Sequence, residues 1–82
     1  MVLTDNSVQS INKVLRRICN ELSFTGISVE DNSMQEFNSA LANLTRRYNA
    51  ENNSAITFIS VKDNSIRSLN TALLYLQRNL GI

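Results

Sequence analysis

The three aspartates of the chain are the first residues that could do chemistry, because each begins the same tripeptide, Asp-Asn-Ser. If three units of the fold brought these carboxylates together, the cluster could hold a divalent cation. A second interpretation needs no ligand, because Asp, Asn and Ser side chains all accept hydrogen bonds from the unpaired N–H groups of a first helical turn. Capping accounts for both residue type and position, so we predict that the tripeptides cap helices and form no metal site. Which of the three residues is the N-cap stays open, although Ser33 with Glu36 would make a capping box. All nine are therefore candidate cap residues. They are Asp5, Asn6, Ser7, Asp31, Asn32, Ser33, Asp63, Asn64 and Ser65.

An asparagine follows each aspartate by seven positions, at Asn12, Asn38 and Asn70. Asn is a poor helix former, so its recurrence inside three expected helices needs a reason. At 100° per residue these positions flank the apolar stripe of their helices. We expect each side chain to bond backbone groups of a neighbouring unit. Binding of a ligand is the alternative.

Four arginines form two pairs, Arg16-Arg17 and Arg46-Arg47, in the second halves of their expected helices. Positive charge there complements the helix dipole, and the long side chains cover apolar edges. If the pairs shared a face they could contact phosphates, which makes nucleic-acid binding an alternative function. The net charge of +1 supplies no strong field for such a partner.

Several kinds of site are excluded by composition. The chain has no histidine and a single cysteine, Cys19, so no Ser/His or Cys/His nucleophile and no His/Cys metal site can form within it. Two glycines cannot make a phosphate-binding loop. We predict no catalytic residues, no cofactor and no enzyme. One cysteine favours a cytoplasmic setting, and no apolar run approaches the roughly 18 residues that a membrane span needs.

The segments around the tripeptides resemble one another. Residues 27–49 and 59–81 are identical at 11 of 23 aligned positions, and residues 1–23 keep the same pattern. The sequence therefore predicts one domain, 1–82, made of three degenerate units at about 1–23, 24–49 and 55–82. A loop at 49–54 absorbs the longer spacing before the third unit.

Hydrophobic periodicity changes within each unit from two to about 3.6 at the tripeptide. Alternation predicts strands at 1–4, 24–30 and 55–62, and a stripe at 3–4 spacing predicts a helix after each tripeptide. Strands joined through helices favour an α/β (or α+β) fold, a small sheet with its helices packed on one face. A sheet of two strands is the alternative, with residues 1–4 unpaired or paired across a dimer.

The third helix has more apolar surface than the other two. Eleven and twelve positions after the aspartate it carries Leu74 and Tyr75, where the first unit has Arg16 and Arg17. We expect these two side chains to form an interface, with Leu80 and Ile82 as contributors. Burial of both faces within one chain is the alternative. The predicted function is a self-associating protein–protein interaction module, an accessory or structural protein, whose partner is a second copy or another protein.

Overall fold

The protein consists of three helices in a computed structural model, which describes residues 2–82. They are α1 (Val8–Leu22), α2 (Met34–Asn52) and α3 (Ile66–Leu80), and residues 2–82 contain no strand. The predicted α/β or α+β fold is therefore wrong, in both its three-strand and its two-strand form, and the fold is all-α. The internal repeat of strand-turn-helix units is wrong for the same reason. Residue 1 of the first predicted strand lies outside the described residues.

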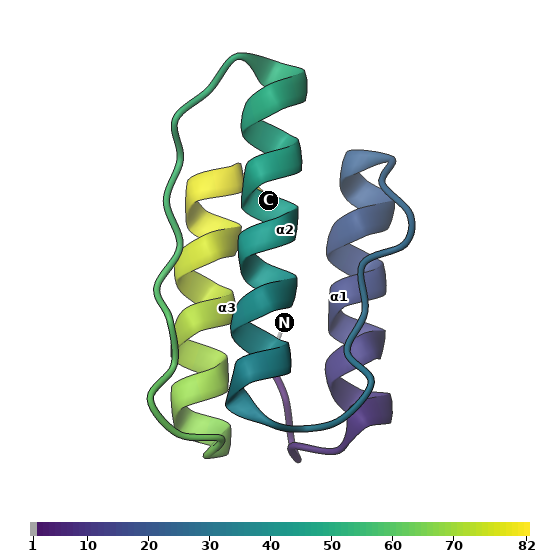
Figure 1. Ribbon diagram of the computed structural model, residues 1–82, viewed down its shortest axis with the longest axis vertical. Coiled ribbons are helices and arrows are strands. Elements are labelled where there is room, and N and C mark those ends of the chain that lie inside the picture. Colours follow the sequence, from purple (N-terminus) through teal and green to yellow (C-terminus); the bar gives the residue numbers. More distant parts are fainter. Residues whose placement is uncertain (1) are drawn as a thin grey trace.

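The three helices lie side by side and run in the same direction, as the colours of Figure 1 show. Each tripeptide therefore lies at the same end of the molecule, at the bottom in Figure 1. Parallel helices cannot be joined by a short turn, so the chain returns along the bundle in extended segments, 23–33 and 53–65. They contain two of the three predicted strands, 24–30 and 55–62.

The extended segments pack on helices instead of on one another. Val29 and Val61 are buried in the core, whereas their neighbours Ser28 and Ser60 are exposed. Any extended chain alternates in this way when one of its sides is buried, because successive side chains point to opposite sides. The alternation of apolar and polar residues thus predicted the extended backbone correctly, but the further prediction of a sheet was wrong.

Local hydrogen bonds set the ends of each helix. The N-caps are Ser7, Ser33 and Ser65, each with extended backbone and a hydroxyl that accepts from the N–H three residues later. Left-handed residues end the helices, with φ of 60° at Ser23 and 75° at Gly81. Helix α2 continues through Asn52, so much of the predicted loop at 49–54 is helical.

The core lies between the three helices and under the extended segments. Its fully buried large side chains are Phe37, Ile11, Leu15, Ile18, Leu41, Leu44, Leu69, Leu73 and Leu76. Each helix contributes to this core through its 3–4-spaced stripe. Within residues 2–82, none of the helices has the length and apolar character needed to cross a lipid bilayer.

Candidate functional site

The repeated asparagines are clamps on the extended backbone. Asn12 Nδ2 donates to the carbonyl oxygen of Val29 at 3.0 Å, and the Val29 N–H donates to Asn12 Oδ1 at 2.7 Å. The same two contacts recur at the other positions and join Asn38 to Val61 and Asn70 to Leu3. One side chain thereby satisfies both backbone groups of a residue that has no strand partner.

The clamps connect the three parts of the chain in a cycle. Helix α1 holds the segment before α2, helix α2 holds the segment before α3, and helix α3 holds the N-terminal segment before α1. The last contact spans 67 positions of sequence and ties the N-terminal segment to the last helix. Each of the three amide groups thus donates one hydrogen bond and accepts one hydrogen bond inside the fold.

The aspartates support the caps from two residues upstream. Asp5 accepts from the backbone N–H and the hydroxyl of Ser7, at 2.9 and 2.6 Å. Hydrogen bonds from Ser7 and Ser10 lower the pKa of Asp5 from its ordinary 3.8 to about 2. The pKa values of Asp31 and Asp63 are also lowered, chiefly by their hydrogen bonds to Ser33 and Ser65.

The middle residues of the tripeptides have less uniform contacts. Asn6 Nδ2 donates to the carbonyl oxygen of Asn64 at 3.0 Å, which joins the starts of α1 and α3. The three carboxylates do not converge. Among residues 2–82 no three His, Cys, Asp or Glu side chains lie close enough together to hold a metal ion.

The arginines proposed as phosphate contacts have different surroundings. Arg47 packs its guanidinium 4.6 Å from the centre of the Phe24 ring and donates to the Thr25 carbonyl oxygen and to Glu51. Arg46 donates to Asn43. Arg16 and Arg17 are exposed on α1 and line different hollows. Arg47 in particular is engaged within the protein.

The predicted interface residues differ in how far they are exposed. Leu74, Tyr75 and Ile82 are 43%, 37% and 45% exposed, whereas Leu80 is only 7% exposed and belongs to the core. The Tyr75 hydroxyl lies 3.0 Å from Thr57 Oγ1, which fixes the ring against the 53–65 segment. Burial of both faces of α3 within one chain is therefore not what the structure shows.

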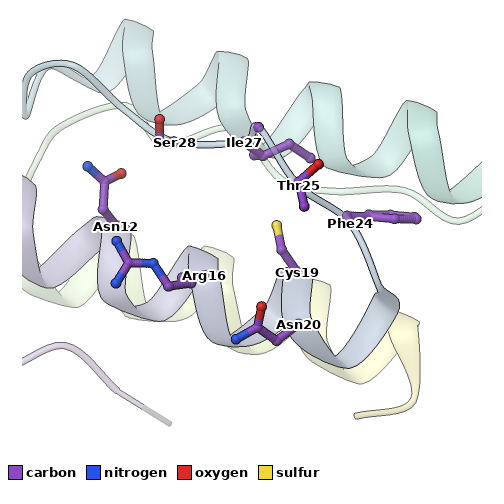
Figure 2. Close-up of a pocket in the computed structure, with 9 residues that line it drawn as sticks. Asn12, Arg16, Cys19, Asn20, Phe24, Thr25, Ile27 and Ser28 are labelled. Carbon is purple, nitrogen blue, oxygen red and sulfur yellow. The ribbon is translucent and has the colours of Figure 1, made fainter.

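A hollow of about 400 Å³ lies between α1 and the segment that follows it, and we call it the Arg16 pocket (Figure 2). Its walls are Asn12, Arg16, Cys19, Asn20, Phe24, Thr25, Gly26, Ile27 and Ser28. Figure 2 shows the Cys19 sulfur pointing from α1 toward the segment. Cys19 is 3% exposed, and burial raises the pKa of its thiol, which therefore stays neutral near pH 7.

Sequence reasoning missed one further clamp. Asn49 exchanges two hydrogen bonds with Ile56, of 3.0 and 2.9 Å, and so fixes the turn after α2. Asn79 also donates to the Thr57 carbonyl oxygen. Neither asparagine has a counterpart in all three segments of the sequence, so repetition gave no signal for them.

Comparison with known proteins gives no match, whether to a protein-family model, to a curated protein or to a solved structure.

Proposed function

We propose that the chain is a non-enzymatic protein–protein interaction module that self-associates through the outer side of α3. One observation carries the proposal. Among residues 2–82 seven large apolar side chains are exposed, and five of them lie on α3, on the segment beside it or directly after it. These five are Ile59, Ile66, Leu74, Tyr75 and Ile82. Exposed apolar side chains that gather along one element of a small domain are typical of an interface.

Comparison with the other two helices supports this choice of surface. Leu74 occupies the position that is Arg16 in α1 and Ala42 in α2, and Tyr75 occupies that of Arg17 and Asn43. Helices α1 and α2 thus meet solvent with polar or small side chains where α3 has large apolar ones. The difference is not required by the core, because both side chains lie outside it.

Charges around the surface predict how association responds to salt. Lys62, Arg67 and Arg78 are exposed there, with Asp63 as the acidic neighbour. A twofold interface brings the same residues of both copies together, so excess positive charge opposes it. Salt screens that repulsion, and we expect the dimer to tighten between low salt and about 0.5 M salt. Binding to the phosphates of a nucleic acid would instead weaken as the salt concentration rises.

The test is the mass in solution of the wild type and of the variants Leu74→Arg and Ser39→Arg. Ser39 is exposed on α2 and provides the matched control for the added charge. We expect the wild type and Ser39→Arg to dimerise, and Leu74→Arg to remain a folded monomer of 9.2 kDa by circular dichroism and light scattering. A wild type that stays monomeric at millimolar concentration, or equal loss in both variants, would refute the proposal.

A reducing compartment such as the cytoplasm is part of the same proposal. The only cysteine is buried in the core and has no partner for a disulfide within the chain. Chains that fold in oxidising compartments at this size usually depend on several disulfides.

A further inference from the structure

One position on the wall of the Arg16 pocket carries no side chain, although the matching position of the next segment does. Gly26 and Phe58 both lie five positions before an Asp-Asn-Ser. Phe58 is partly buried against the core and lies over α2, where it lines a hollow together with Asn38 and Ala42. Gly26 lies over α1 beside Asn12 and Arg16, which are the matching positions. A Cβ built on Gly26 would meet no atom within 4 Å. The hollow over α1 thus corresponds to a place that holds a phenyl ring over α2.

The groups around this pocket favour a negatively charged occupant. Its walls offer hydrogen-bond donors in the Arg16 guanidinium, the Asn20 amide and the Thr25 and Ser28 hydroxyls, and no carboxylate lines it. Within residues 2–82 the one ion pair joins Arg47 to Glu51, so Arg16 has no acidic partner. A planar guanidinium binds a carboxylate through two parallel hydrogen bonds.

The remaining walls are apolar. Phe24 and Ile27 come from the extended segment, and the neutral Cys19 thiol comes from α1. The volume of about 400 Å³ is within the range of pockets that hold small organic ligands, roughly 300–1,000 Å³. The matching position over α2 holds a flat apolar ring, that of Phe58.

We propose that the Arg16 pocket binds a small aromatic carboxylic acid. The carboxylate pairs with Arg16, and the ring lies over Gly26 against Ile27 and Cys19. This site is separate from the outer side of α3, and its occupancy does not depend on self-association.

Benzoate and its neutral analogue benzamide provide matched probes, because they share the ring and differ in charge. We expect benzoate to shift the backbone amide resonances of Cys19, Asn20 and Gly26 in a saturable manner. Binding of benzamide should be at least tenfold weaker. Arg16→Ala should weaken benzoate binding at least tenfold, whereas Arg17→Ala, its exposed neighbour on α1, should leave the binding unchanged.

Three results would overturn the proposal: no saturable shift with benzoate, equal binding of benzamide, or equal loss in Arg16→Ala and Arg17→Ala. Circular dichroism of both variants establishes that they fold. Arg16 is exposed, and within residues 2–82 its side chain makes no hydrogen bond or ion pair that the substitution would break, so a folded Arg16→Ala variant is expected. The Cys19→Ser variant gives a second readout, because it replaces the thiol by a smaller and more polar hydroxyl. Benzoate binding should weaken, while the preference of the pocket for benzoate over benzamide should stay the same.

Discussion

Replacement of Asn12 by Ala should destabilise the fold far more than an ordinary helix substitution. The variant removes both hydrogen bonds to Val29, and Val29 is only 3% exposed, so water cannot readily replace them. A buried backbone group left without a partner costs about 1–3 kcal/mol, which gives roughly 2–6 kcal/mol for two groups. Ala is the better helix former by about 0.6 kcal/mol, which offsets part of the loss. We expect a net destabilisation of about 3 kcal/mol.

Asn20→Ala is the control on the same helix. Asn20 is exposed and its side chain makes no hydrogen bond within residues 2–82, so only helix propensity changes and the variant should be slightly more stable than the wild type. Urea denaturation followed at 222 nm gives both free energies of unfolding. For a domain of this size, a loss of 3 kcal/mol corresponds to a melting temperature lowered by about 12–24 °C.

Asn12→Asp tests the mechanism as well as the magnitude. The carboxylate keeps an acceptor for the Val29 N–H but places an oxygen against the Val29 carbonyl, where the amide nitrogen had donated. The Asn12→Asp variant should therefore be destabilised about as much as Asn12→Ala at pH 7. Part of its stability should return when the carboxyl group is protonated. If Asn12→Ala lies within about 0.5 kcal/mol of Asn20→Ala, the clamp does not stabilise the fold and the reasoning is refuted.

The caps and their aspartates provide two further predictions. Ser33→Ala removes the acceptor of the Glu36 N–H and should cost about 1 kcal/mol in urea denaturation, whereas Ser39→Ala on the exposed side of α2 should not destabilise the protein; equal midpoints would contradict the capping account. Because the folded-state pKa of Asp5 is lowered to about 2, its stabilisation is fully present above about pH 4 and is lost as pH falls through about 2. Asp5→Asn should therefore lose less stability than the wild type between pH 4 and pH 2, and an unchanged pH dependence would contradict that assignment.

The parts of the fold that depend on neighbours in sequence were predictable. A cap acts within three residues, so the Asp-Asn-Ser tripeptides fixed where α1, α2 and α3 begin. The Asn at the seventh position was also informative, because a poor helix former inside a helix indicates a contact elsewhere. Its expected partner, the backbone of a neighbouring unit, is what the structure shows at Val29.

The error about the sheet has a specific physical cause. Alternation at 24–30 and 55–62 reports an extended chain with one buried side, and a helix surface can bury that side as well as a sheet can. A strand's backbone needs hydrogen-bond partners, and the usual assumption is that another strand supplies them. Here single asparagine side chains supply them at Val29 and Val61, and the alternation within the extended segments does not distinguish such a partner from a second strand.

Sequence alone thus determined where the helices start, which side of each faces the core and which asparagines reach outside their own helix. Only the tertiary structure decided that the extended segments lie on helices, that Leu80 is buried while Leu74 stays exposed, and that Cys19 lies beside a hollow. The first set depends on contacts within about one or two helical turns, which the order of residues fixes directly. The second depends on how three parallel helices share one core, because the exposure of a side chain is set by elements that are distant in sequence.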